Sequence, residues 1–129
     1  MHIALLAPMP PEQNGIADYA AHLRAALEGL GLKVSTPLAG LGNDPQRAIE
    51  RVAHSDWQGI DLVHAELGGG RLAEFHALKA LRERFPSLPL SATVHDPERL
   101  VWRRASLPWP LSLACLLYTS DAADEEDSV

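Results

Sequence analysis

Apolar and polar positions alternate along the first hundred residues in a way that predicts strands and helices following one another. Residues 2–8 form a short apolar run without a charged side chain, which is typical of a strand buried on both faces of a parallel sheet. A proline-rich loop with one glycine follows this run. Beyond the loop, apolar residues recur every three or four positions and predict one face of a helix: Ile16, Tyr19, Ala20, Leu23 and Leu27.

The same alternation continues along the chain and predicts an ordered series of elements. The spacing predicts a strand at 32–37, a helix at 45–54, a strand at 60–65, a helix at 71–85 and a strand at 88–94. Gly29 and Gly31 provide a stop for the first helix, and Asp44 before Pro45 is a strong start for the second. The order βαβαβαβ predicts an α/β, Rossmann-like open parallel sheet with strand order 2-1-3-4 and helices on both faces.

Charge and cysteine content narrow the class of protein. The net charge is −6, but five of the seventeen acidic residues lie in the last nine positions, where no basic residue occurs. The rest of the chain is close to neutral and has no basic stripe, so we expect no nucleic-acid partner. A single cysteine, the lack of an apolar run of ~20 residues and the lack of a signal-peptide pattern favour a cytoplasmic protein without a transmembrane segment.

Beyond residue 100 the alternating pattern ends, and the chain divides into two parts. We expect residues 1–114 to form a partial N-terminal Rossmann-like domain. Residues 115–125 resemble translated sequencing-adapter sequence, which implies that residues 115–129 are non-native and that the natural gene was cut near residue 114. The alternative is a disordered acidic tail, because residues 119–129 contain five carboxylates and too little apolar surface to offset the cost of ordering the backbone.

The strand, loop and helix at the N-terminus predict a ligand site. They place the start of a helix at the carboxyl end of a parallel strand, where unpaired N–H groups and the helix dipole favour an anion such as a phosphate. Asn14 and Gly15 stand at this helix start, while Glu66 and His95 stand near the ends of the third and fourth predicted strands. We therefore expect the glycine loop, Glu66 and His95 to gather at one edge of the sheet.

Two other features have both a structural and a functional interpretation. Glycines 68–70 form either a flexible loop or a loop that faces a ligand. His64, inside the third predicted strand, is either a hydrogen-bonded core histidine or a ligand. A zinc site from His64, Glu66, His95 and Asp96 is disfavoured, because the chain lacks a histidine pair at i, i+4 spacing and cysteine ligands, so we expect no metal and no cofactor.

Three segments together resemble the N-terminal half of a GT-B glycosyltransferase, specifically the large retaining group known as family 4. Residues 7–19 are similar to the first glycine loop of that family, and residues 61–68 to its third-strand segment. Residues 91–96 are similar to its Thr-x-His-Asp strand end. Asn14 departs from the family pattern, since many members have a glycine at that position.

The resemblance implies that the parent protein transfers a sugar from a nucleotide-sugar donor to a hydroxyl of a glycan or glycolipid acceptor, with peripheral membrane contact allowed. The implied residues are Asn14, Gly15 and Ile16 for the donor phosphate, His95 for catalysis beside the transferred sugar, and Glu66 and Asp96 for the acceptor side. No segment resembles the C-terminal half of the family, so the fragment alone is expected to be inactive. The competing hypothesis is a non-catalytic α/β module that binds a phosphorylated ligand or a protein partner.

Overall fold

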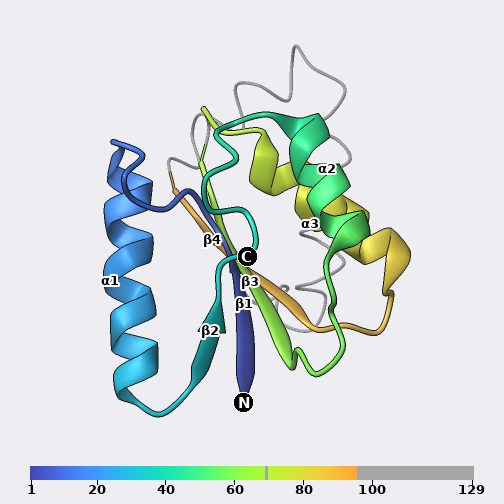
Figure 1. Ribbon diagram of the computed structural model, residues 1–129, viewed down its shortest axis with the longest axis horizontal. Helices are drawn as coiled ribbons and strands as arrows, with labels where there is room; N and C mark the ends of the chain where they lie inside the picture. The colour runs from blue at the N-terminus through green and yellow to red at the C-terminus, as the bar shows by residue number, and fades with distance from the viewer. Residues whose placement is uncertain (69, 96–129) are drawn as a thin grey trace, which may run out of the picture.

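A computed structural model describes residues 1–68 and 70–95, in which three helices and four strands alternate (Figure 1). In chain order the elements are β1 (His2–Leu6), α1 (Gly15–Gly29), β2 (Lys33–Ser35), α2 (Pro45–His54), β3 (Leu62–Leu67), α3 (Ala73–Arg84) and β4 (Leu90–Val94). Asp96, which the family resemblance places on the acceptor side, lies outside the described residues. The tail at 115–129 also lies outside them.

All four strands join one parallel sheet in the order β2-β1-β3-β4, which confirms the predicted α/β fold class and strand order. Ile3 in β1 pairs with Val34 of β2 on one side and with Leu62 of β3 on the other. Glu66 in β3 pairs with Thr93 of β4. Because the chain reverses its direction of winding at β1, a ligand crevice is expected between the carboxyl ends of β1 and β3.

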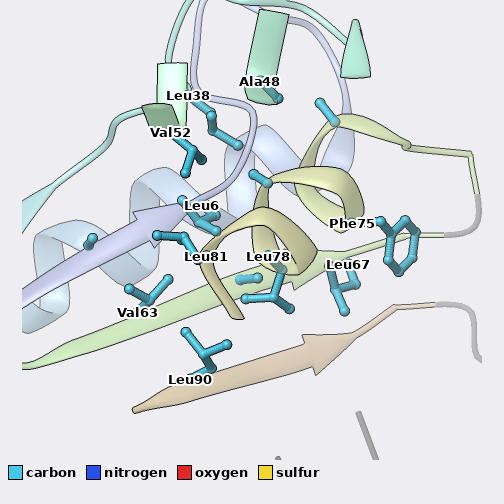
Figure 2. Packing of buried hydrophobic residues seen from close by; sticks show 14 of the residues in the cluster. Leu6, Leu38, Ala48, Val52, Val63, Leu67, Phe75, Leu78, Leu81 and Leu90 are labelled. Atoms are coloured by element: carbon cyan, nitrogen blue, oxygen red, sulfur yellow. The ribbon is translucent and has the colours of Figure 1, made fainter. Parts of the chain in front are cut away.

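Helices cover both faces of the sheet, with α1 on one face and α2 and α3 on the other (Figure 1). Side chains along and just after β1 point alternately into the two hydrophobic cores on the opposite faces of the sheet. Ala4 and Leu6 belong to the core beside α2 and α3, whereas Leu5 and Ala7 belong to the smaller core beside α1. Figure 2 shows the larger core, in which leucines of α3 pack on the strands. Each fully buried leucine contributes roughly 1.5–3 kcal/mol, so this layer holds the sheet together.

The third strand begins two residues later than the apolar pattern predicts. Ile60 closes a turn by donating its N–H to the carbonyl of Trp57, and the strand runs from Leu62 to Leu67. The apolar pattern stops before Glu66 because a charged side chain is unusual inside a buried strand. Glu66 nevertheless lies within β3 and is fully buried, so its carboxylate must find polar partners inside the protein.

Local capping defines the ends of the helices. At the start of α1, the side chain of Asn14 accepts a hydrogen bond from the N–H of Ala17 at 2.8 Å. At the start of α2, Asp44 Oδ1 accepts from the N–H of Gln46 at 2.9 Å. Gly31, two residues after α1, has φ of +91°, a left-handed conformation that a residue with a side chain adopts only with strain. The predicted start of α2 and the predicted stop of α1 are thus confirmed, whereas α3 begins at Ala73, two residues later than predicted.

We expect Asp44→Ala to lower the free energy of unfolding by about 1 kcal/mol, because the first turn of α2 loses the acceptor for its N–H groups. Urea unfolding followed by circular dichroism measures this loss. Asp44→Asn keeps an acceptor oxygen at the same place and should change the free energy by less than ~0.5 kcal/mol. An unchanged free energy of unfolding in Asp44→Ala would show that the cap does not stabilise α2.

Candidate functional site

A pocket of about 500 Å³ lies at the carboxyl edge of the sheet. The start of α1, the turn after β3 and the residue after β4 all contribute to it. Among the described residues, its lining consists of Asn14, Gly15, Ile16, Gly68, Gly70, Arg71 and His95. The structure therefore brings the predicted glycine loop and His95 together from the two ends of the described chain.

The start of α1 presents backbone N–H groups at the pocket. The side-chain oxygen of Asn14 already accepts the hydrogen bond of the Ala17 N–H. The N–H groups of Gly15 and Ile16 come before the first intrahelical hydrogen bond, so they can donate to an anion. A Cβ added at Gly15 would meet no atom within 4 Å, so packing in the described part of the chain does not require a glycine there. Gly15 instead leaves open space beside these N–H groups.

The two described glycines after β3 differ in what they contribute. Gly68 is buried, and a Cβ added to it would lie 2.5 Å from Cδ1 of Ile16, so the end of β3 approaches α1 closely there. A Cβ at Gly70 would meet nothing within 4 Å, and its carbonyl accepts a hydrogen bond from Asn43 Nδ2 at 3.1 Å. Both glycines line the pocket, and Gly68 is also a packing residue.

Glu66 is a carboxylate with no solvent exposure, held between two imidazoles. Its Oε1 lies 2.7 Å from Nε2 of His95, and its Oε2 lies 2.9 Å from Nε2 of His64. A carboxylate accepts hydrogen bonds and cannot donate, so each imidazole donates through Nε2. The pairing satisfies both carboxylate oxygens and leaves Nδ1 as the ring nitrogen of His95 that Glu66 does not bind.

His64 extends this network across the sheet. Its Nδ1 lies 2.7 Å from Oγ of Ser91, and its Nε2 also lies 3.0 Å from Oγ1 of Thr93. These side chains share one face of β3 and β4, because every second residue of a strand points the same way. His64 is not among the pocket-lining residues, and Glu66 connects it to the pocket residue His95.

His95 is held from three directions. Its N–H donates to the carbonyl of Leu67 at 2.7 Å, and its Nε2 is bound to Glu66. The ring of Tyr19, on α1, stands edge-on to the imidazole with 5.2 Å between ring centroids. The orientation of His95 is therefore set before a ligand arrives, which lowers the entropic cost of binding.

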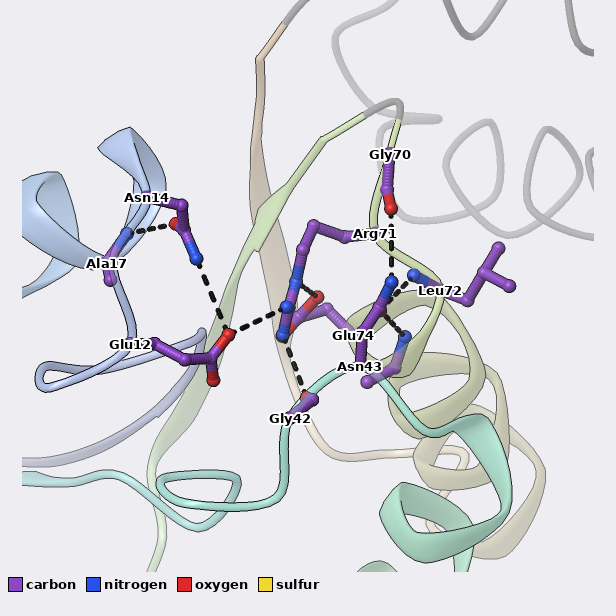
Figure 3. Close-up of polar contacts among 10 residues, drawn as sticks. Glu12, Asn14, Ala17, Gly42, Asn43, Gly70, Arg71, Leu72 and Glu74 are labelled. Carbon is purple, nitrogen blue, oxygen red and sulfur yellow. Dashed lines mark hydrogen bonds and ion pairs between the residues drawn. The ribbon is translucent and has the colours of Figure 1, made fainter.

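A second polar cluster surrounds Arg71 (Figure 3). The guanidinium donates through Nε and Nη2 to the carboxylate of Glu74 at 3.1 and 2.8 Å, and through Nη2 to the carbonyl of Gly42 at 3.0 Å. Its Nη1 donates to Oε1 of Glu12 at 3.0 Å. Burial alone lowers the pKa of Arg71, but the hydrogen bonds and charges of Glu74 and Glu12 outweigh it and raise that pKa above its ordinary value. Arg71 is thus a permanent cation in the pocket wall.

Some of the site residues predicted from the sequence line the pocket, and others lie behind its wall. Gly15 and His95 line it, whereas Glu66 is bound to His95 and is not part of the lining. Its role toward an acceptor stays a prediction. Sequence reasoning missed Arg71 and Glu12 as site residues. The spacing of Arg71 and Glu74 by three positions at a helix start was a usable signal, but no local pattern connects Glu12 with them.

A larger pocket of about 610 Å³ lies at the opposite edge of the sheet, before β3 and β4 begin. Its lining includes Trp57, Phe85 and Leu88 and has Asp61 and Arg84 as its charged side chains. Asp61 is already bound to the N–H of His2 at 2.8 Å. Because ligands of open α/β sheets bind at the carboxyl ends of the strands, we assign the candidate site to the smaller pocket.

The chain matches no model of a known protein family, no curated protein and no solved structure. Within residues 1–68 and 70–95, no group of three or more His, Cys, Asp or Glu side chains is arranged to hold a metal ion. Across the same residues, no helix has the length and apolar content needed to cross a bilayer. The candidate site therefore has to be interpreted from its own geometry.

Proposed function

We propose that this chain is the N-terminal half of a GT-B-type glycosyltransferase that uses a nucleotide-sugar donor. The observation that most supports the proposal is a single pocket that combines the start of α1 with the fixed imidazole of His95. A helix start suits the donor diphosphate, and an oriented imidazole suits a sugar hydroxyl. Both groups lie at the carboxyl edge of a parallel sheet, the usual ligand position of the fold.

In this proposal, each pocket residue has a defined role. The N–H groups of Gly15 and Ile16 donate to a phosphate of the donor. His95 exchanges a hydrogen bond with a hydroxyl of the transferred sugar through Nδ1, because Nε2 is committed to Glu66. Glu66 is a positioning residue, since it is buried and acts through His95.

Sugar transfer needs more positive charge than this pocket offers. Arg71 already faces two carboxylates, so it adds little net charge to stabilise a leaving diphosphate. We propose that a second half of the enzyme closes over the donor and supplies that charge, with a glycan or glycolipid hydroxyl as acceptor. Residues 1–129 alone should then bind the donor without transferring its sugar.

We expect Gly15→Ala to weaken binding of UDP-glucose or GDP-mannose by about tenfold, because the added methyl group enters the space beside the phosphate-binding N–H groups. Isothermal titration calorimetry on residues 1–129 measures this effect. Gly29→Ala is the matched control: it lies at the other end of α1, and its Cβ also meets nothing within 4 Å. Equal affinities of the two variants would contradict the phosphate site.

His95→Ala separates the transferase from a non-catalytic module. A donor site loses affinity for the nucleotide sugar but keeps its affinity for the matching nucleoside diphosphate, because His95 contacts only the sugar. A module that binds phosphorylated ligands without a sugar subsite responds equally to both compounds. Equal effects would therefore favour the module over the transferase.

A further inference from the structure

Arg71 lines the pocket, yet most of its hydrogen-bonding capacity is used within the protein. A guanidinium has five N–H donors. Two of them bind Glu74 and one binds the carbonyl of Gly42, which ties Nε and Nη2 to the protein interior. The remaining nitrogen, Nη1, binds Glu12 (Figure 3). Glu12 uses one of the two N–H groups of Nη1, so Nη1 is the nitrogen at which a ligand anion would meet Glu12.

The two carboxylates on Arg71 differ in how firmly they are held. Glu74 has no exposed side-chain surface, makes two hydrogen bonds to Arg71 and follows it by three residues, so it cannot leave without an uncompensated buried charge. The Glu12 side chain keeps 26% of its surface exposed and makes one ion pair to Arg71 from a separate loop. Its second oxygen, Oε2, is buried without a hydrogen-bond partner among the described residues. Glu12 is therefore the weaker of the two partners.

The position of Glu12 also links it to the helix start of α1. Asn14, which caps α1 and lines the pocket, donates its Nδ2 to Glu12 Oε1 at 3.4 Å. A carboxylate oxygen here is bound by a guanidinium and an amide, the same types of donor that bind a phosphate oxygen. Glu12 and a bound anion would compete for Nη1 of Arg71 and Nδ2 of Asn14, and their negative charges would repel each other if both lay beside these donors.

We propose that Glu12 occupies the anion position on Arg71, and that a phosphate-bearing ligand binds by displacing it. The displaced carboxylate moves into solvent, and Nη1 of Arg71 and Nδ2 of Asn14 donate to a phosphate oxygen instead. This inference rests on the proposed function for the pocket and adds Arg71 and Glu12 to the groups that set its affinity for anions. The ligand class is a phosphate or diphosphate ester. A ligand with a single carboxylate would offer Arg71 and Asn14 no more than Glu12 already does, so it would not displace Glu12.

The test is titration of residues 1–129 with inorganic pyrophosphate at low salt. Glu12→Gln keeps the shape of the side chain, removes its charge and should bind pyrophosphate about tenfold more tightly than the wild type. Asp18→Asn is the matched control, since it removes one negative charge from an exposed position in the first turn of α1. It should change the affinity by less than about threefold. Adding Arg71→Lys to Glu12→Gln should abolish the gain in pyrophosphate affinity. The single ammonium of a lysine lacks the planar set of donors with which Arg71 binds Glu74 on one side and a phosphate on the other.

Equal affinities of the wild type and Glu12→Gln overturn the inference, as do equal gains in Glu12→Gln and Asp18→Asn. If the wild type nevertheless binds nucleotide sugars and Gly15→Ala weakens that binding, the proposed function stands, but the displacement of Glu12 from Arg71 by a phosphate does not. Failure of both Glu12→Gln and wild type to bind pyrophosphate also overturns the inference. In that case the nucleotide-sugar titration decides the proposed function separately.

Discussion

Glu66→Ala is expected to lower the free energy of unfolding by about 3 kcal/mol, one of the largest effects of a single substitution in this protein. The substitution leaves a cavity inside β3 and removes the carboxylate that accepts from Nε2 of both His64 and His95, of which His64 keeps Oγ1 of Thr93 at 3.0 Å. The side chains of His64 and His95 are 21% and 23% exposed, so water replaces the lost partner only in part. Urea unfolding of residues 1–129 measures the loss.

Glu66→Gln tests the hydrogen-bonding pattern with little change of volume. An amide has one acceptor oxygen and one donor NH2 group, so it can accept from only one of the two imidazoles. We expect a loss of about 1–2 kcal/mol. We also expect the ¹⁵N shifts of one histidine to report a changed tautomer. Glu83→Gln, in an exposed pair with Lys79, is the control and should cost less than ~0.5 kcal/mol. Unchanged imidazole shifts in Glu66→Gln would contradict the role of Glu66 as a positioning residue.

Glu74→Ala is expected to lower the free energy of unfolding by about 3–5 kcal/mol. The guanidinium of Arg71 stays largely buried in this variant, and the partly exposed Glu12 is its one remaining carboxylate partner among the described residues. The Arg71 side chain is 11% exposed, so solvent screens its charge poorly. Chemical denaturation at neutral pH measures the effect. Arg71 also joins the start of α3 to the loops after β1 and before α2 through Glu12 and Gly42, and Glu74 holds the guanidinium in place for these contacts.

Two further variants separate burial from ion pairing in this cluster. Lys79→Ala removes an ion pair of similar length on the same helix, 2.7 Å against 2.8 Å, but that pair is exposed and should cost less than ~0.5 kcal/mol. Replacing Arg71 by Met and Glu74 by Leu together should recover much of the stability lost in Glu74→Ala, since an apolar pair has no charge to solvate. A double variant as unstable as the single one would show that the contacts to Glu12 and Gly42 carry the stability instead.

Both buried carboxylates lie beside the candidate pocket. Glu66 binds the pocket residue His95, and Glu74 binds the pocket residue Arg71. A fold selected only for stability would place apolar side chains at such positions, because burial of a charge costs free energy even when it is paired. Polar groups that are costly for folding and gather around one pocket are typical of a functional site, which supports the assignment of the candidate site to this pocket.

The sequence alone determined the elements and their order. The apolar run at residues 2–8, the helical spacing after Gly15 and the cap at Asp44 are local features, so each follows from neighbouring residues. The alternation of strands and helices then specified a parallel sheet, because the right-handed crossover rule leaves few other arrangements. The exact bounds were less well determined: β3, α3 and β4 each begin two residues later than predicted, and in β3 the charge of Glu66 interrupted the apolar pattern within the strand.

Which polar groups meet depends on contacts between elements that are far apart in the chain. His64 and Glu66 contact Ser91, Thr93 and His95 because β3 and β4 pair in register, and that register places the apolar residues of both strands in the core beside α2 and α3. Likewise, the start of α3 has no cap of its own and receives one from Asn43, whose Oδ1 accepts from the N–H of Leu72 at 2.7 Å. Glu12 and Arg71 are 59 residues apart in the chain. Short-range spacing carries no information about such contacts, because the same side chains would be solvated if the strands paired one residue out of register.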